Sequence, residues 1–249
     1  MKRGGVLLGC LLLLVLSAPT ALFADQTTID LRSIVLENFE PGPDHHDWTA
    51  QGNQYITPGF PKTAYANTWP EALNGANPPN ASQLQALGVN AQFDRQGYNR
   101  VDIFPYRKDA SGNIVSDPIQ IPGRVRTLDL WVWGSNHDFT LDVELQDYEG
   151  VDYVLSLGSL DYAGWKDLMV TIPPSIPQEV NTIPRLRGLK LVKFMIWSRP
   201  RGNVSNFFVY FDQIKVLTDM FETRIDGERL ANPAEVQKIW GNPQQGSKP

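Results

Sequence analysis

Residues 186–219 read LRGLKLVKFMIWSRPRGNVSNFFVYFDQIKVLTD, and this stretch decides the fold. Two runs rich in β-branched and aromatic residues flank a short polar segment, 199–206, which contains a proline and a glycine. Such a pattern predicts a β-hairpin whose loop is longer than a tight turn. Because an apolar hairpin of this kind is not stable alone in water, we expect it at the centre of a larger sheet.

The alternation of side chains within the two runs predicts which residues share a face. In the first run, the apolar face consists of Val192, Phe194 and Ile196. The opposite face is mixed and consists of Leu191, Lys193, Met195 and Trp197. In the second run, the parity of the apolar positions changes between Phe211 and Ile214. One extra residue near Asp212–Gln213 would bring both apolar sets to the same side, so we predict a β-bulge there.

Seven further runs have the length and composition of strands and are separated by turn-forming residues. They are residues 29–40, 87–93, 98–105, 125–133, 139–145, 153–157 and 164–172. We interpret 87–93 and 98–105 as hairpin partners joined by a turn at Asp94–Gly97. About eight to ten short strands at regular spacing, with scarcely any helix, are typical of an antiparallel sandwich. The predicted fold is all-β: an antiparallel β-sandwich of the jelly-roll, galactose-binding-like type with a short C-terminal helix.

The last residues predict that helix. Asn232 is an N-cap residue, Pro233 and Glu235 occupy the first and third helical positions, and Gly241 follows the end. The apolar stripe at helical spacing consists of Val236, Ile239 and Trp240. The helix either docks on its own sandwich or, because so short a helix is marginal alone, forms an arm that binds a neighbouring subunit.

The start of the chain predicts export. Residues 1–24 combine a basic start, an apolar run from Val6 to Leu16 and small residues before Asp25, which is the pattern of a cleaved secretory signal. Cleavage would leave 225 residues with 20 basic and 27 acidic side chains, a formal charge of −7 and no cysteine. Cys10 lies too early for a lipoprotein signal, so we expect no membrane anchor. The acidity argues against nucleic-acid partners, and the lack of thiols excludes disulfides and thiolate sites.

The mature chain is expected to form one β-sandwich domain over residues 25–226, followed by the helix and a loose tail over 227–249. A long Pro- and Asn-rich loop is predicted at about 55–82. This loop contains aromatic residues, so we expect it to be ordered and to cover the sandwich or to meet a partner.

The sequence contains no recognisable catalytic motif. A Gly-rich phosphate loop, a serine nucleophile elbow, an HExxH zinc motif and paired cysteine ligands are all missing from it. A glycosidase acid–base pair is not singled out, because most carboxylates fall on outward strand positions or turns. We therefore expect no enzymatic activity and no cofactor. Four potential metal ligands occur at 44–47, but consecutive side chains point in opposite directions, so a solvated loop is favoured there.

Two ligand hypotheses remain open. A calcium ion could tie the first strand to the last, and the candidate ligands are Glu37, Glu40 and Asp212. Exposed tryptophans could stack on sugar rings, and the candidates are Trp131, Trp133, Trp165 and Trp197. We favour packing in the core or at a protein interface for these tryptophans, because aromatic side chains dominate both.

Five segments of the chain carry a family resemblance: LGVNAQFDRQGYN at 87–99, WVWG at 131–134, YAGWKDL at 162–168, KFMIW at 193–197 and FVYFDQIKVLTD at 208–219. In this order they resemble the spirochaete periplasmic flagellar outer-layer proteins, the FlaA family. The likeness runs from about Leu36 to Asp226. The loop at 58–82 and the C-terminal helix match nothing that we can assign to the family.

The resemblance implies a non-enzymatic sheath subunit that coats a flagellin core filament in the periplasm and influences filament stiffness and curvature for motility. The implied partners are core flagellin and other sheath subunits, with a glycan on flagellin as a further candidate. From exposure and composition, the candidate interface residues are Phe60, Tyr65, Trp69, Arg199, Arg201, Val236, Ile239 and Trp240. The alternative function is a secreted carbohydrate-binding jelly-roll module.

Overall fold

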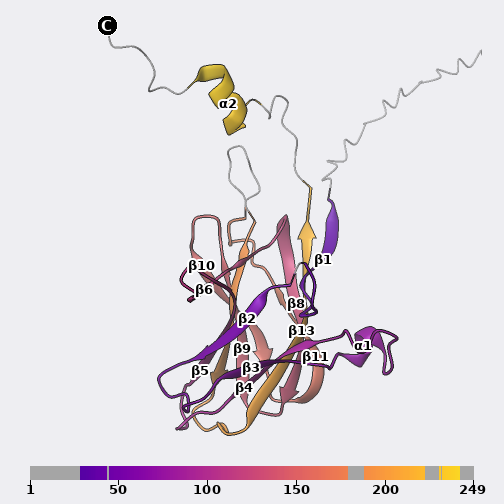
Figure 1. The fold of residues 1–249 in the computed structure, drawn as a ribbon, viewed down its shortest axis with the longest axis vertical. Helices are drawn as coiled ribbons and strands as arrows, with labels where there is room; N and C mark the ends of the chain where they lie inside the picture. Colours follow the sequence, from indigo (N-terminus) through magenta and orange to yellow (C-terminus); the bar gives the residue numbers. More distant parts are fainter. Residues whose placement is uncertain (1–28, 44, 179–187, 222–229, 231, 242–249) are drawn as a thin grey trace, which may run out of the picture.

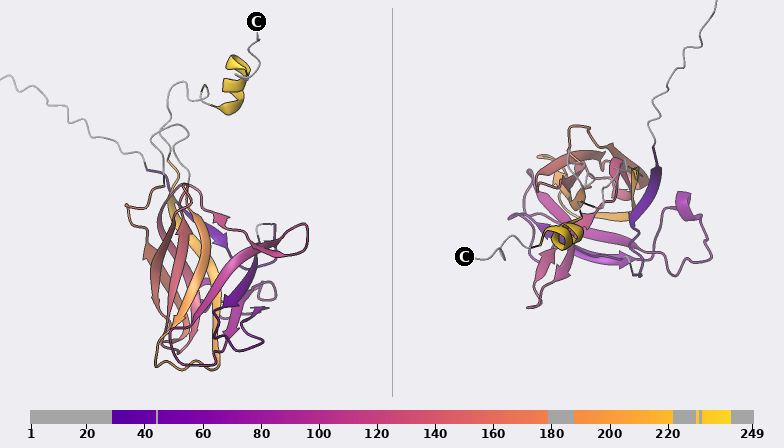
Figure 2. Two further views of the ribbon diagram at one scale, coloured as in Figure 1. Left: turned by 90° about the vertical axis from the view of Figure 1, so that its left-hand side faces the viewer. Right: turned by 90° about the horizontal axis from the view of Figure 1, so that it is seen from above.

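A computed structural model describes residues 29–43, 45–178, 188–221, 230 and 232–241. Two antiparallel sheets pack face to face, with their strands along the long axis of the sandwich (Figures 1 and 2). Among the described residues there are thirteen strands and two short helices, α1 (Glu71–Asn74) and α2 (Pro233–Trp240). The predicted all-β jelly-roll sandwich with a short C-terminal helix is confirmed.

The first sheet, sheet A, is organised around its longest strand, β13. Its strands are, in spatial order, β11 (Ala163–Thr171), β8 (Arg124–Ser135), β13 (Phe207–Asp219), β4 (Ala86–Ala91) and β3 (Lys62–Ala66). The first strand of the chain, β1 (Leu31–Glu37), also pairs with β13. The chain therefore begins and ends its sandwich side by side in one sheet.

The second sheet, sheet B, is organised around β12 and β5. Its strands are, in spatial order, β10 (Asp152–Ser159), β9 (Phe139–Gln146), β12 (Lys190–Ser198), β5 (Arg100–Lys108) and β2 (Asp47–Gly52). Two short strands complete it: β6 (Ile114–Ser116) pairs with β5, and β7 (Ile119–Gln120) pairs with β12. The sequence pattern did not reveal β2, β3, β6 or β7, which is why it predicted fewer strands.

The predicted central hairpin is wrong, because its two strands lie in opposite sheets. β12 belongs to sheet B and β13 to sheet A, and the segment between them crosses from one layer to the other. The two strands face each other across the core and bury their apolar sides there. The rings of Phe194 and Phe211 are stacked, with centroids 5.9 Å apart. A segment of 199–206 is long enough to span the ~10 Å between packed sheets.

The same correction applies to the second predicted hairpin. β4 lies in sheet A and β5 in sheet B, so the turn at Asp94–Gly97 also connects the layers. By contrast, β9 and β10 form a true hairpin, in which Tyr153 is opposite Leu145. Alternation predicts which residues are buried, but two facing strands and two paired strands produce the same pattern.

The predicted β-bulge in the last strand is confirmed. The register between β13 and β8 shifts between Asp212 and Lys215, and Gln213 adopts a φ of 49°. The extra residue keeps the apolar positions on both sides of the bulge buried: Phe207, Val209, Phe211, Ile214 and Val216. A second irregularity, between Leu191 and Lys193, turns Leu191 into the core in place of Val192, contrary to the prediction from simple alternation.

The predicted loop at 55–82 contains regular structure. β3 forms the edge of sheet A there, directly after Pro61, and α1 follows Pro70. Prolines at the boundaries of an edge strand do not interrupt the hydrogen bonding of the sheet, so the proline-rich composition concealed this strand. Within the described parts of the chain, no helix combines the length and the apolar composition needed to cross a membrane.

Candidate functional site

The outer side of sheet A presents a cluster of aromatic side chains. Since Leu130 and Val132 of β8 point into the core, the alternating tryptophans of that strand point outward. Trp133 is directly opposite Trp165 of β11 and Tyr210 of β13. We call the surface formed by these residues the aromatic face: Trp131, Trp133, Trp165, Phe208 and Tyr210.

Ring contacts hold the aromatic face together. The rings of Trp133 and Phe208 are stacked, with centroids 5.5 Å apart and an interplanar angle of 16°. Tyr210 meets Trp133 edge-on, with a centroid distance of 5.9 Å. Phe208 remains 36% exposed on this outer surface. Rings fixed in this way form a rigid, largely apolar surface, which suits contact with another protein.

A hollow of about 400 Å³ lies beside the aromatic face, over β3, β4 and β13. Its lining includes Ala64, Gly88, Phe208 and Tyr210, with Lys62 at its edge. A side chain at position 88 would bring a Cβ to 2.9 Å from Cε1 of Tyr210. The glycine therefore lets the tyrosine ring lie close over β4 and shapes the floor of the hollow.

Asp212 lies on the same side of sheet A as the aromatic face, beside Trp131 at the bulge of β13. It is 4% exposed and is paired in register with Trp131. Burial raises the pKa of Asp212 to about 8, and the charge of Glu40 acts in the same direction. Burial also raises the pKa of Glu40, which accepts a hydrogen bond of 3.0 Å from Asn38. The two carboxyl groups thus lie near each other, at the point along β13 where its pairing partner changes from β4 to β1.

Glu37 has a different environment from these two carboxyl groups. Its buried carboxylate accepts hydrogen bonds from the backbone N–H groups of Phe39, at 2.8 Å, and His46, at 2.9 Å, and from Trp48 Nε1 at 3.3 Å. The Nδ1 atoms of His46 and His45 lie 3.1 and 3.4 Å from it. Glu37 therefore fixes the β1–β2 connection through protein donors.

This arrangement bears on the metal hypotheses. In the part of the chain that the structure describes, no group of three or more His, Cys, Asp or Glu side chains is placed to hold a metal ion. Glu37 is surrounded by donors, so it does not join Glu40 and Asp212 in a ligand set. Of the four residues 44–47, Asp44 lies outside the described residues, and both histidines face Glu37. Calcium binding stays a prediction of the sequence.

The outer side of sheet B is polar and carries one of the four candidate tryptophans. Trp197 of β12 is opposite Thr140 of β9 and Arg100 of β5. The Arg100 guanidinium lies 5.3 Å from the centroid of the indole ring. Because Trp131, Trp133 and Trp165 lie on sheet A, the four tryptophans do not form a single sugar platform.

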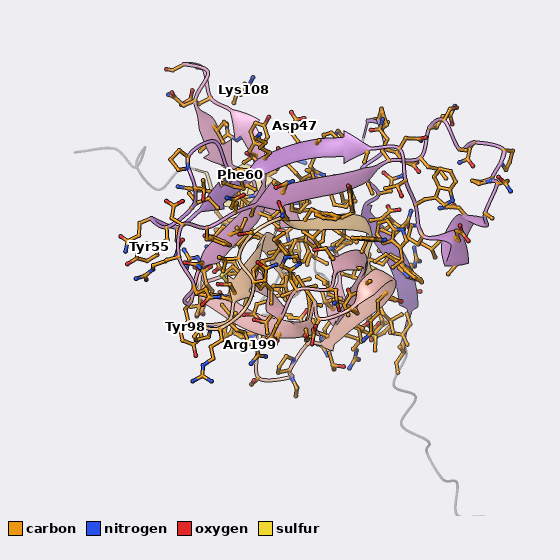
Figure 3. All side chains as sticks on the ribbon, turned by 90° about the horizontal axis from the view of Figure 1, so that it is seen from below. Asp47, Tyr55, Phe60, Tyr98, Lys108 and Arg199 are labelled. Atoms are coloured by element: carbon orange, nitrogen blue, oxygen red, sulfur yellow. The ribbon has the colours of Figure 1, made fainter. Side chains whose placement is uncertain are left out.

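The candidate interface residues of the loop at 55–82 are partly engaged within the molecule. The Tyr65 hydroxyl accepts a hydrogen bond of 3.3 Å from the Trp48 backbone N–H, and burial raises the pKa of this tyrosine to about 12. Trp69 Nε1 donates to the Gly75 carbonyl at 2.9 Å. Lys62 lies 5.0 Å from the ring centroid of Phe60, which projects from one end of the sandwich (Figure 3).

The remaining candidates are exposed and lie in two places. Arg199 and Arg201 follow β12, and Arg199 forms an ion pair of 3.0 Å with Asp138. The predicted caps of α2 are confirmed: Asn232 Oδ1 accepts from Ala234 N at 3.0 Å, and Gly241 ends the helix. The stripe on α2 is solvent-accessible, and Trp240 is 81% exposed, so the helix is not docked on its own sandwich (Figure 1).

Sequence reasoning missed three surface aromatics. Phe208 and Tyr210 have the opposite parity to the core residues of β13, so alternation could have assigned them to the outer face. Tyr98 is 70% exposed in the connection between β4 and β5. No local signal could have located it, because its exposure depends on how that connection joins the two sheets.

The family described as flagellar filament outer layer protein Flaa matches residues 45–227. A flagellar filament outer layer-like protein of Brachyspira hyodysenteriae is 29% identical over 135 residues, which are 54% of this chain and 58% of that protein. The flagellar filament outer layer protein of Borreliella burgdorferi is 24% identical over 158 residues, 57% of this chain and 46% of that protein. The chain thus spans about half the length of these relatives.

The solved structures to which this chain is similar include carbohydrate-binding modules and the enzymatically active domain of a bacteriophage tailspike protein. A family 11 module of a Clostridium thermocellum cellulase is 10% identical, with a TM-score of 0.42, and covers 78% of this chain and 98% of that one. A family 61 module bound to β-1,4-galactotriose is 13% identical, with a TM-score of 0.37, and covers 73% and 94% of the two chains. The family match, by contrast, extends over most of the sandwich, and we conclude that this chain belongs to the family of flagellar filament outer layer proteins.

Proposed function

We propose that this protein is a structural subunit of the sheath around the flagellin core of a periplasmic flagellar filament. The observation that carries the proposal is the exposed aromatic face of sheet A in a member of an outer-layer family. The export pattern of residues 1–24 supports a periplasmic location. Core flagellin and other sheath subunits are the partners in this proposal.

The aromatic face supports a broad contact with the filament. Its stacked rings are fixed before binding, so little side-chain entropy is lost when a partner covers them. The adjoining hollow makes part of the same surface concave, which favours a partner of complementary shape. Many such contacts repeated along a filament would hold the coat by multivalency even if each were weak.

The helix α2 supports a second contact, between neighbouring subunits. Eight residues are too few to form a stable helix without tertiary packing. Val236, Ile239 and Trp240 together form an exposed apolar stripe, which a groove on a partner would cover. We propose that α2 is an arm that reaches the next subunit of the sheath.

A coat joined in these two ways would affect the mechanics of the filament. Lateral contacts through α2 would resist bending, and radial contacts through the aromatic face would transmit that resistance to the core. We therefore propose that the protein influences filament stiffness and curvature, and through them motility. Electron microscopy of filaments with and without the protein tests this role: unchanged diameter and curvature would contradict it.

The direct test of the proposal is quantitative mass spectrometry of washed periplasmic filaments. We expect the mature chain to remain on the filament at a constant ratio to core flagellin. Phe208→Ser should lower the retained amount several-fold, because it removes the exposed ring of the aromatic face. Val154→Ser is the matched control, since Val154 is an exposed apolar residue of β10 on the other sheet. If both variants are retained like the wild type, the aromatic face is not the filament contact.

A further inference from the structure

A second surface hollow lies on the opposite side of the sandwich, at one end of sheet B. It measures about 340 Å³ and is lined mainly by Tyr98, Thr140, Asp142, Trp197 and Arg199. Figure 3 shows Tyr98 and Arg199 projecting side by side at that end. A volume at the lower end of the range for small-molecule sites leaves room for a mono- or disaccharide.

Tyr98 projects into solvent from a segment that is firmly held. The Ser198 hydroxyl donates to the Gly97 carbonyl at 2.7 Å and accepts from the Asn99 N–H at 3.0 Å, while Ser198 N–H donates to the Asn99 carbonyl at 3.0 Å. Asn99 and Ser198 are both fully buried. The Tyr98 side chain is therefore 70% exposed on a backbone whose two neighbouring residues are anchored, which leaves its ring accessible to a ligand from a fixed position.

The neighbouring contacts extend this support. Asn99 Nδ2 donates to the Arg95 carbonyl at 2.9 Å, and the Arg95 guanidinium lies 3.3 Å from the ring centroid of Tyr55. On the other side of the hollow, Arg100 lies against the Trp197 ring. The Trp197 ring and the backbone on either side of Tyr98 are thus held by contacts outside the hollow, which reduces the entropy lost on binding.

The polar group of the hollow is the Asp142 carboxylate. Within the described part of the chain, no hydrogen bond or ion pair involves it, although it is only partly exposed. Two neighbouring acidic residues of this sheet face are paired: Asp102 with Arg100 at 2.9 Å, and Glu144 with Lys193 at 3.4 Å. Asp142 therefore keeps its acceptor capacity for a ligand that brings hydrogen-bond donors.

We propose that the hollow between Tyr98 and Trp197 binds a neutral saccharide. The apolar faces of a sugar ring stack on aromatic rings, and a carboxylate accepts hydrogen bonds from neighbouring hydroxyl groups. A phosphate or other anionic ligand would be repelled by Asp142. Arg100 and Arg199 are each paired with a carboxylate, Asp102 at 2.9 Å and Asp138 at 3.0 Å, so neither is a free cation for an anionic ligand. The site lies on the opposite sheet from the aromatic face, and its saccharide binding does not depend on that face.

Isothermal titration calorimetry with the full mature chain tests the proposal. The first probes are glucose, galactose, mannose, N-acetylglucosamine and their β-1,4-linked disaccharides, and we expect heat of binding with at least one of them. Tyr98→Ala should weaken that binding about tenfold, through loss of stacking. Asp142→Asn should weaken it by a similar factor, through loss of a charged acceptor. Met169→Ala, at an exposed position of β11 on sheet A, is the control and should bind like the wild type.

Two further titrations distinguish the source of the sugar. Glycans released from washed filaments would indicate a sugar carried by the filament, whereas disaccharide fragments of the cell wall would indicate the wall as the ligand. Binding of either probe that is lost in Tyr98→Ala supports the proposal. No binding by any saccharide at millimolar concentration, or equal binding by Tyr98→Ala, Asp142→Asn and wild type, overturns it. Filament retention that depends on Tyr98 without any sugar binding would likewise overturn it and assign the hollow to a protein contact.

Discussion

The two outer faces of this sandwich differ in chemistry although they cover the same core. Sheet A presents stacked aromatic rings, whereas sheet B presents ion pairs around Trp197. On sheet B, the Lys193 amine lies 3.7 Å from Asp102 and 3.4 Å from Glu144. A large dry surface suits a protein partner, and a small hollow among fixed polar groups suits a small hydroxylated ligand.

The difference shows how one fold carries two separate surfaces. Only every second residue of a strand is needed for the core, so the outward positions are free to vary. In β8 the outward positions hold tryptophans, and in β9 they hold Thr140, Asp142 and Glu144. The proposed functions therefore rest on positions that do not determine the fold. Four predictions test this division.

The largest effect is expected from the core that both faces share. Phe211→Ala removes a ring that is buried in sheet A and stacked on Phe194 of sheet B. The variant should lose about 4 kcal/mol in free energy of unfolding, through lost burial and a residual cavity. Urea titration followed by circular dichroism measures the loss. Filament binding by sheet A and sugar binding by sheet B should both weaken in this variant. Loss of sugar binding with filament binding retained would contradict a common core.

The next effect belongs to sheet A alone and depends on pH. Because the pKa of Asp212 rises from 3.8 in the unfolded chain to about 8 when folded, the folded state resists ionisation. The free energy of unfolding should therefore fall as the pH rises from about 4 to about 8 and stay level above that range. Asp212→Asn keeps the shape of the side chain and should abolish this slope.

Calcium binding at this site would change the dependence of stability on pH. If the ion binds Asp212 together with Glu40, millimolar calcium should restore stability at pH 8 in the wild type and leave Asp212→Asn unchanged. Thermal unfolding at pH 5 and pH 8, with calcium or with a chelator, distinguishes the two cases. If calcium leaves the stability of the wild type unchanged at both pH values, the ionisation of buried Asp212 alone explains the dependence of stability on pH.

The third prediction compares the hydrogen bonds that support the backbone near two exposed aromatic residues, Tyr98 and Phe208. Ser198→Ala removes hydrogen bonds of 2.7 and 3.0 Å that anchor the segment of Tyr98. We expect a loss of about 2 kcal/mol in free energy of unfolding, because the buried Asn99 N–H loses its acceptor. Ser135→Ala, beneath Phe208, removes a long bond of 3.4 Å from the Phe208 N–H and a contact of 3.0 Å with His137 Nδ1. Because His137 Nδ1 also lies 3.0 Å from the Ser135 carbonyl oxygen, this variant should cost less, about 1 kcal/mol. Calorimetric unfolding of both variants checks the ranking, and equal losses would refute it.

Much of the fold could be predicted from the sequence because burial leaves a local pattern. The alternation in β9 and the parity change before Ile214 predicted the core face and the bulge correctly. The caps of α2 were also readable, since Asn232 and Gly241 act within one helical turn. Strand pairing was not readable, because partners are chosen by the whole sandwich: the runs containing Phe194 and Phe211 face each other instead of pairing.

The candidate surfaces were predictable only in part. The sequence identified Trp131, Trp133 and Trp165 as candidate surface residues. It did not reveal that Trp197 lies on the opposite sheet. Glu37 looked like a free ligand in the sequence, whereas its partners at 45–48 become visible only when β1 and β2 are placed together. The hollow beside Tyr98 joins residues from three separate connections and strands. Non-local contacts of this kind leave no periodic signal.

The smallest effect compares one lysine from each face. Lys193 on sheet B and Lys215 on sheet A are about equally exposed, and Lys215 has one carboxylate partner, Asp129, at 2.8 Å. Lys193→Gln should cost about 1 kcal/mol, because Asp102 and Glu144 are then left without their shared cation. Lys215→Gln should cost about half as much.

Salt separates these electrostatic losses from losses of packing. Raising the ionic strength to 1 M shortens the screening length to about 3 Å, so both losses should shrink, and that of Lys193→Gln should shrink more. Urea titrations of both variants at low and high salt measure this difference. A greater loss from Lys215→Gln, or losses insensitive to salt, would mean that the stems of these side chains, rather than their charges, stabilise the two faces. The charged surface of sheet B would then contribute to stability in the same way as the aromatic surface of sheet A, through packing.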